Sequence, residues 1–394
     1  MRLRHGSRMA LLAALVFATV GVFARPAAVS AQSAHPYDCG KLDYGLYWYG
    51  KNSFNQKAVP GVANPYYDPS KPTVIYVHGW QQGSVAVGGR ENFWWADANV
   101  NTAHAWIDAG WNIGIFHWTQ FADEPGGGIG GAIPYYAEAK IWLGTYVGTA
   151  PDPDVAVNMR WRTCNGAFST AGMPTVSAAQ LFYNAYTSAL SGYAGPEIRI
   201  VGHSLGNQMA VRTTRMISDN IDAGRIGSRL LPARVALVDP YWSNGAKSYL
   251  GNRWVGEVIR EHVTHLRNNR NVTFEWTKTS NVLDLGGDQN DALIGLISRT
   301  EIVPTYIPNT DQARRHNAAP KLYFASFASA APAECWNNSA SGSCSPTGRR
   351  AHSAATSLAR TREIMNAGGK WYQHIGLNTA TPADNQYRCV DRCP

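Results

Sequence analysis

The chain has 394 residues, of which 45% are hydrophobic and 16% are charged. This length holds one large domain or two ordinary ones, and it is ample for a buried core. The charged fraction lies below the roughly 25% of an average soluble domain, which argues against a disordered or coiled-coil protein. Half of the formal net charge of +8 comes from arginines at positions 2, 4, 8 and 25, in a segment without acids, and no Lys/Arg run follows. We therefore expect no nucleic-acid partner.

The amino terminus has the three parts of a signal peptide. Residues 2–8 are basic, residues 9–23 form an apolar run, and residues 29–31 are small enough for signal-peptidase cleavage. A transmembrane anchor is the alternative, but it needs about 20 apolar residues, which is more than this run supplies. The sequence thus predicts a signal peptide over residues 1–31 and a protein secreted to the extracellular space or the periplasm.

The cysteines all lie beyond this segment, at positions 39, 164, 335, 344, 389 and 393. An even number of cysteines in an oxidising compartment predicts disulfides. Cys335 and Cys344 bracket a short Gly/Ser-rich loop, so we expect them to pair. Cys389 either pairs locally with Cys393 or ties the tail to Cys39. No C-x-x-C is matched by a second one or by a histidine pair, which argues against a zinc site.

After an aromatic entry segment, short β-branched runs alternate with stretches of helical spacing. The expected strands are residues 73–77, 113–118, 197–201 and 234–238, and helices are expected within 93–109, 177–190 and 207–217. This alternation predicts the α/β class, with a mostly parallel sheet covered by helices on both faces.

The stretch over about 241–350 is less regular. A helix over residues 254–266 and a strand over 272–277 are expected within it. The chain shows no internal repeat and no linker long enough to separate two domains. We therefore expect residues 32–394 to form a single domain with an irregular insertion at about 241–350.

Residues 202–206 read Gly-His-Ser-Leu-Gly, which fits the pattern G-x-S-x-G. A predicted strand leads into this pattern and a predicted helix leaves it, as in the sharp turn that exposes a nucleophilic serine. The alternative is a chance pentapeptide in a Gly-rich chain. With the flanking elements in place, Ser204 is the expected nucleophile, and the Leu205 N–H is expected to face the same point.

A serine nucleophile needs a base and a carboxylate that orients the base. Asp239 follows the next predicted strand and is the expected carboxylate; an ordinary turn at Asp239 and Pro240 is the alternative. Asp284, which follows a later strand, is the second candidate. For the base, we expect His352, on a loop before a predicted helix over residues 353–365. His316 and His265 remain alternatives.

The tetrahedral oxyanion needs a second backbone donor, from the loop after an early strand. His78, Gly79 and Trp80 follow the strand over residues 73–77. Because Gly79 lets the backbone turn, the Trp80 N–H is the expected donor beside that of Leu205. An ordinary strand-to-loop turn is the alternative.

Four short motifs together resemble the pancreatic-lipase-type family of secreted α/β-hydrolases. They are V-H-G-W at 77–80, I-x-I-V-G-H-S-L-G at 198–206, V-x-L-V-D-P at 235–240 and A-H-S-A-A at 351–355. The resemblance implies the α/β-hydrolase fold and a triad of Ser204, Asp239 and His352. The chain departs from the family because no cysteine between Cys164 and Cys335 brackets a lid.

These features predict an exported serine ester hydrolase that works through an acyl-enzyme and requires no metal or organic cofactor. The expected substrates are acyl esters such as glycerides or phospholipids, reached by transient contact with a lipid surface. The alternatives are a simple carboxylesterase acting on soluble esters and a lipase-fold binding protein without activity. The intact Gly-His-Ser-Leu-Gly sequence argues against the latter.

Two features bear on the substrate. Asp291 is expected to cap an apolar helix over residues 292–297, which either covers the site as a lid or belongs to the core. An acyl groove is expected to be lined by aromatic side chains at positions 94, 95, 118, 135 and 136.

Overall fold

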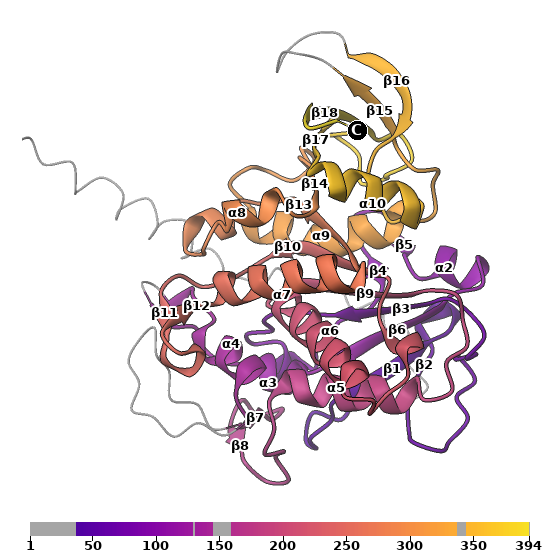
Figure 1. The fold of residues 1–394 in the computed structure, drawn as a ribbon. Coiled ribbons are helices and arrows are strands. Elements are labelled where there is room, and N and C mark those ends of the chain that lie inside the picture. The colour runs from indigo at the N-terminus through magenta and orange to yellow at the C-terminus, as the bar shows by residue number, and fades with distance from the viewer. Residues whose placement is uncertain (1–36, 129–130, 145–158, 337–343, 394) are drawn as a thin grey trace, which may run out of the picture.

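The computed structural model describes residues 37–128, 131–144, 159–336 and 344–393. The predicted signal peptide lies outside these residues. Within them the chain forms a 12-stranded sheet (Figure 1). In the order in which they pair, its strands are β16 Ser345–Arg350, β15 Ala333–Trp336, β18 Gln386–Asp391, β17 Lys370–Ile375, β14 Ser298–Glu301, β13 Thr273–Lys278, β10 Arg234–Pro240, β9 Ile198–Ser204, β3 Thr73–Val77, β6 Asn112–His117, β1 Gly45–Tyr49 and β2 Asn55–Lys57.

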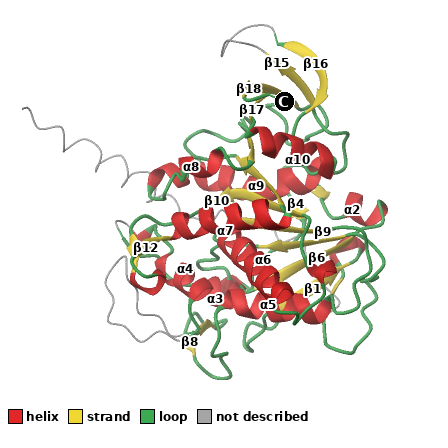
Figure 2. Cartoon of the chain, in the orientation of Figure 1, coloured by secondary structure: helices red, strands yellow, loops and turns green. Residues whose placement is uncertain are grey.

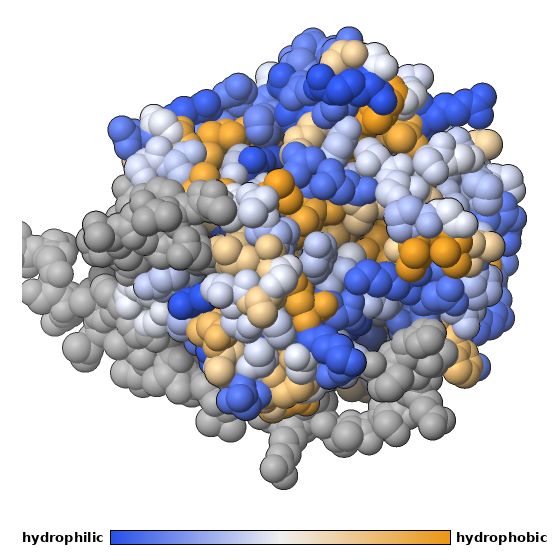
Figure 3. Space-filling model, turned by 90° about the horizontal axis from the view of Figure 1, so that it is seen from below, coloured by the Kyte–Doolittle hydropathy of each residue, from blue (hydrophilic) through white to orange (hydrophobic). Residues whose placement is uncertain are grey.

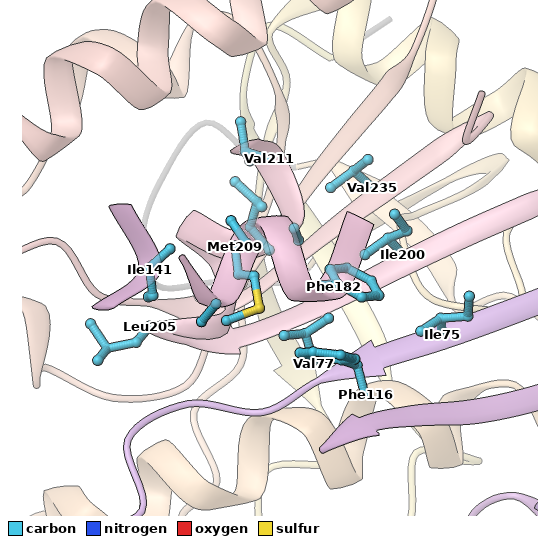
Figure 4. Close-up of a cluster of buried hydrophobic side chains, with 14 of the residues drawn as sticks. Ile75, Val77, Phe116, Ile141, Phe182, Ile200, Leu205, Met209, Val211 and Val235 are labelled. Atoms are coloured by element: carbon cyan, nitrogen blue, oxygen red, sulfur yellow. The ribbon is translucent and has the colours of Figure 1, made fainter. Parts of the chain in front are cut away.

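The centre of the sheet is parallel from β6 to β17, and antiparallel pairs occur toward both edges. Strand β3 reads Thr-Val-Ile-Tyr-Val and is buried throughout, as expected for a strand covered on both faces. Ile75 and Val77 contribute to the hydrophobic cluster on one face, and Val74 and Tyr76 to the cluster on the other. Figure 4 shows Ile75 and Val77 in the first of these clusters.

Helices cover both faces of the sheet (Figure 2). Residues of α3 Thr119–Ala122, α4 Tyr135–Trp142, α5 Ala178–Ala189, α6 Gly206–Asp222 and α7 Val255–Arg270 pack into the cluster that holds Ile75. Residues of α2 His104–Asp108 and α9 Gln312–Ser326 pack into the opposite cluster. Helix α8 is Asp291–Ile294, and α10 Leu358–Ala367 contacts β13 and β14.

The strand order reverses at β3. From β3 the chain crosses to β6 on one side and then returns to β9 on the other side of β3, and β10, β13 and β14 continue in that second direction. In open α/β sheets, ligands bind beyond the carboxyl ends of the strands at such a reversal. The topology is that of the α/β-hydrolase fold, and the carboxyl ends of β3 and β9 are where its site is expected.

Most expected elements in the first two thirds of the chain coincide with observed ones. Strand 73–77 is β3, and helix 177–190 is α5, whose Ser177 side chain accepts a hydrogen bond from the Gln180 N–H at 3.2 Å. The helix expected within 93–109 is only the short α2, because β4 Trp94–Trp95 and β5 Val100–Asn101 pair before it. Two further small ribbons are β7 Trp161–Arg162 with β8 Phe168–Ser169, and β11 Ala246–Lys247 with β12 Arg253–Trp254.

The segment over 241–350 is more regular than expected. It contributes β13 and β14 to the parallel sheet and α7 and α9 to the two faces. By contrast, the helix expected over 353–365 begins later: α10 is Leu358–Ala367, and Ser357 caps it by accepting from the Arg360 N–H at 3.2 Å.

Three disulfides are present, Cys39–Cys164, Cys335–Cys344 and Cys389–Cys393. The expected pairing of Cys335 with Cys344 is confirmed, and Cys389 pairs locally rather than with Cys39. Three disulfides are typical of proteins that fold in an oxidising compartment.

Among the described residues, no helix combines the length and apolar character needed to cross a bilayer. On the face seen in Figure 3, apolar residues form several separate groups among polar ones.

Candidate active site

Ser204 lies at the carboxyl end of β9, immediately before α6. Its φ of +53° is in the left-handed region, which is costly for a residue with a side chain and persists only where the surroundings enforce it. The turn is tight: a Cβ added at Gly202 would lie 2.6 Å from the Gly206 carbonyl oxygen. The strand, strained serine and helix therefore form the sharp turn that the sequence predicts.

Asp239 lies on the neighbouring strand β10, where the register shifts and Pro240 pairs with Ser204. Its side chain is buried and accepts hydrogen bonds from the main-chain N–H groups of Thr279 and Ser280 at 3.0 and 3.3 Å. The Ser280 hydroxyl also donates to its Oδ2. The loop after β13 thus fixes this carboxylate beside the serine.

His316 lies near the start of α9, and its Nδ1 donates to Asp239 Oδ2 at 2.7 Å. The His203 ring packs against the His316 ring with a centroid separation of 4.5 Å, and His203 Nε2 donates to the His316 carbonyl at 3.0 Å. Burial, followed by the proximity of His316, holds the pKa of His203 well below its usual value. His316 is therefore hydrogen-bonded to Asp239, which precedes the register partner of Ser204 on β10, and it packs on His203, which precedes Ser204 in sequence.

The structure does not bring His352 to this site. His352 is buried, its Nε2 donates to Glu275 on β13, and its Nδ1 is hydrogen-bonded to Thr300 Oγ1 at 3.0 Å. Burial opposes ionisation of Glu275, but the charges of Arg234 and His352 outweigh it and keep the Glu275 pKa well below its usual value. Because both ring nitrogens of His352 have partners other than Ser204 and Asp239, the geometry does not support the expectation that His352 is the base.

The other candidates from the sequence also lie elsewhere. Asp284 is exposed and pairs with Lys278 at 3.1 Å. His265 lies on the outer part of α7, where its Nδ1 is hydrogen-bonded to the Asn269 side-chain amide at 3.1 Å. Neither residue is hydrogen-bonded to Ser204, Asp239 or His316 within the described part of the chain.

The loop after β3 lies directly against the serine. A Cβ added at Gly79 would lie 2.5 Å from Ser204 Cβ and 3.1 Å from its Oγ, so only glycine permits this approach. Trp80 follows Gly79 in sequence, and Leu205, which follows Ser204, occupies the N-cap position of α6. The backbones of the two expected oxyanion donors thus flank Ser204.

His78 secures the end of β3. Its Nδ1 donates to the Gly79 carbonyl at 3.0 Å, and its Nε2 accepts from the Trp118 main-chain N–H at 3.2 Å. The Trp118 indole N–H donates to the His78 carbonyl at 2.8 Å. Burial lowers the pKa of His78 to about 4, which matches an imidazole that accepts at Nε2.

The expected aromatic groove is not formed. Trp118 is fully buried in the main cluster, Trp95 belongs to the cluster that holds Trp371 of β17, and Tyr135 with Tyr136 forms a separate small cluster. These side chains fill different parts of the interior, so they do not line one acyl site.

The structure bears on the two interpretations of the apolar run over residues 292–297, a lid or part of the core. Helix α8 spans only Asp291–Ile294, its N-cap is Asn290 rather than Asp291, and no side chain caps it. Leu293 and Ile297 are fully buried in the main hydrophobic cluster. The apolar run therefore belongs to the core, which was the alternative that the sequence left open.

No family model and no curated protein matches the chain. Some solved structures resemble it weakly. A probable hydrolytic enzyme from Pseudomonas aeruginosa PAO1 is 15% identical over 52% of this chain and 45% of that chain, with a TM-score of 0.21. The esterase Est22 is 14% identical over 71% and 78%, with a TM-score of 0.30. Esterase B from Lactobacillus rhamnosis is 14% identical over 75% and 83%, with a TM-score of 0.25.

This chain spans less than half the length of the Pseudomonas enzyme. At such TM-scores the likeness carries no argument about activity. The assignment of roles therefore depends on the chain's own topology and side chains.

Proposed function

We propose that the protein is a serine ester hydrolase that works through an acyl-enzyme. In this proposal Ser204 is the nucleophile, His316 is the general base, and Asp239 orients the imidazole. The observation that carries the proposal is the 2.7 Å hydrogen bond from His316 Nδ1 to Asp239, formed beside a serine on a strained strand-to-helix turn. Because Nδ1 carries the donated proton, His316 Nε2 is the basic nitrogen.

In the first half-reaction, Ser204 Oγ attacks the ester carbonyl carbon while His316 Nε2 takes the hydroxyl proton. The carbonyl electron pair moves to oxygen, and the N–H groups of Trp80 and Leu205 stabilise the resulting oxyanion. When this intermediate collapses, the bond from carbon to the leaving oxygen breaks. His316 returns the proton to that oxygen, and the alcohol departs from an acyl-Ser204.

In the second half-reaction, water takes the place of the alcohol. His316 Nε2 removes a proton from the water as its oxygen attacks the acyl carbon. The tetrahedral intermediate collapses with return of the proton to Ser204 Oγ, and the carboxylic acid is released. Asp239 stabilises the imidazolium in both halves by accepting from its Nδ1–H.

The burial of the apolar run over residues 292–297 bears on the substrate class. The expectation of glycerides or phospholipids depended on an exposed apolar helix, and that support is lost because Leu293 and Ile297 are buried. We propose that the substrate is a carboxylic ester, either dissolved or dispersed in water. Secretion of the protein remains an expectation from its sequence. A binding protein without activity is the less favoured alternative, since a carboxylate fixed by several donors beside a strained serine has no evident use there.

A fluorophosphonate probe tests the proposal. It should label the wild-type protein at Ser204, and Ser204→Ala should abolish both labelling and hydrolysis of a p-nitrophenyl ester. Loss of a triad member typically costs about 10⁴-fold in kcat. His265→Ala is the control: His265 lies on α7, where its side chain is hydrogen-bonded to Asn269, so this variant should keep wild-type activity. Wild-type protein that is folded but neither labelled nor active would favour the binding protein.

A further inference from the structure

The loop that carries the Trp80 N–H is hydrogen-bonded to the segment that follows the next strand, β6. The Trp80 indole N–H donates to the Glu124 carbonyl at 2.8 Å, and the Gln81 main-chain N–H donates to the Ala122 carbonyl at 3.2 Å. Between these two acceptors lies Asp123. The loop after β3 thus has its conformation set by residues about 40 positions away in sequence.

Asp123 holds the far end of the same loop. Its Oδ1 accepts from the Gly83 N–H at 2.7 Å, and its Oδ2 accepts from the Val85 N–H at 2.9 Å. The side chain is almost completely buried, and its loop partners are main-chain amides. A buried carboxylate that gives both oxygens to one loop fixes that loop more firmly than a single neutral hydrogen bond does.

The segment that contains Asp123 is itself braced from the other side. The carboxylate of the next residue, Glu124, is fully buried and accepts from Lys140 on α4 at 2.6 Å. Arg160 donates to both oxygens of Glu124, at 2.8 and 2.7 Å. The two adjacent acids therefore have different roles: Glu124 anchors the segment to Lys140 and Arg160, and Asp123 binds the loop after β3.

We propose that Asp123 is a positioning residue that holds the Trp80 N–H in line with the oxyanion. The inference depends on the proposed function and goes beyond it. Gly79 places the loop against Ser204, but a donor is effective only when it lies about 2.7–3.1 Å from the point where the negative charge develops. The bonds to Gly83 and Val85 remove the freedom that the loop would otherwise have to move its first residue away.

Asp123→Asn separates this role from general stability. Asparagine has nearly the same shape, but its NH₂ group cannot accept, so one of the two loop N–H groups loses its partner. For a soluble p-nitrophenyl ester, we expect kcat to fall about 10- to 100-fold, because loss of a whole oxyanion donor costs about 10²- to 10³-fold. KM should change less than threefold, since the donor acts mainly in the transition state.

A trifluoromethyl ketone supplies the second measurement. The Ser204 oxygen adds to the carbonyl carbon of the ketone and forms a hemiketal oxyanion. The inhibition constant of the ketone should therefore rise by the same factor by which kcat falls. Glu334→Gln is the matched control: Glu334 is an equally buried acid, but it accepts from Arg360 and the Trp371 indole in the carboxyl-terminal part of the sheet. Glu334→Gln should leave kcat and the inhibition constant at their wild-type values, even where it lowers the free energy of unfolding.

If Asp123→Asn does not fold, Asp123→Glu keeps the charge and moves the oxygens by one methylene. It should lower kcat and ketone affinity together by about 3- to 10-fold, less than the loss of one oxyanion donor. Either variant with wild-type kcat and ketone affinity would overturn the inference, as would an equal loss in Glu334→Gln. Failure of the proposed function is distinct, because wild-type protein would then show no fluorophosphonate labelling.

Discussion

At the residue scale, the organising group is the carboxylate of Asp239. It accepts from two main-chain N–H groups, from the Ser280 hydroxyl and from His316 Nδ1. An ionised carboxylate has acceptor sites for all four donors, whereas a protonated one would oppose one of them. The surroundings therefore fix the position of this carboxylate, and in the proposed mechanism His316 is the partner that transfers a proton to and from the substrate.

Substitution of the two histidines should separate catalysis from stability. His316→Ala should lower kcat about 10⁴-fold while the free energy of unfolding changes little. His352→Ala should keep the activity of its folded fraction. It removes one hydrogen bond to the buried Glu275, which keeps Arg234 and Tyr323 as partners, so it should cost about 1–3 kcal/mol. Ester hydrolysis and urea unfolding measure the two quantities. An inactive but stable His352 variant beside an active His316 variant would restore the original expectation.

The positions of Ser204 and Asp239 could be predicted because local patterns define them. A serine on a turn between strand and helix, and an aspartate at the end of the next strand, are recognisable within a few residues. The histidine could not be chosen in this way. No local pattern distinguishes His316, which lies within the first turns of α9, from His352, which lies on the loop before α10. Only the packing of α9 over β9 and β10 decides which ring reaches Asp239.

At the element scale, the same difficulty affects α8. Its apolar sequence is equally compatible with a lid and with a core segment, because periodicity reports burial and not the partner that covers the side chains. In the structure the helix is short, Gly295 follows it, and β14 begins three residues later at Ser298, so the run enters the parallel sheet. Because the run over residues 292–297 leads directly into β14, it cannot open as a lid without disturbing the pairing of that strand.

Leu293→Ala tests this assignment. A fully buried leucine that is truncated to alanine should cost about 2–5 kcal/mol in free energy of unfolding. Leu296→Ala, at a partly exposed position on the same run, should cost less. The ratio of rates on an emulsified and a soluble ester should stay at the wild-type value in both. A variant at Leu293 with wild-type stability and a changed rate on the emulsion would instead indicate a lid.

At the scale of the whole molecule, the disulfides differ most in the length of chain that they close. Cys39–Cys164 spans 125 residues and ties the entry segment to the region beside β7, whereas Cys389–Cys393 spans 4. In the chain-entropy model the stabilisation grows with this length, from about 2 kcal/mol for the shortest loop to about 5 kcal/mol for the longest.

Two pairs of substitutions compare these disulfides. Replacement of Cys39 and Cys164 by serine should lower the urea midpoint clearly more than replacement of Cys389 and Cys393. The reason is that the longer loop removes more conformations from the unfolded chain. Equal shifts for the two double variants would show that contacts in the folded state, and not loop length, determine the effect.

Buried neutral histidines should make the whole molecule sensitive to acid. Burial is the main cause that lowers the pKa of His78 to about 4 and that of His117 and His203 well below the usual value. In the unfolded chain these groups titrate near 6.5. The contribution of these buried neutral histidines to the free energy of unfolding is thus complete above that pH. It is lost as the pH falls toward the folded pKa, because only the unfolded chain takes up the protons.

We therefore expect the free energy of unfolding to fall steadily from pH 7 to pH 5, with about 2 kcal/mol of the loss at pH 5 arising from His78 alone. Urea unfolding at several pH values measures this slope, which gives the number of protons that unfolding takes up. His262→Gln removes another group whose pKa burial lowers to about 4, outside the candidate site, and should reduce the slope. A stability that is independent of pH over this range would show that these histidines accept protons in the folded protein.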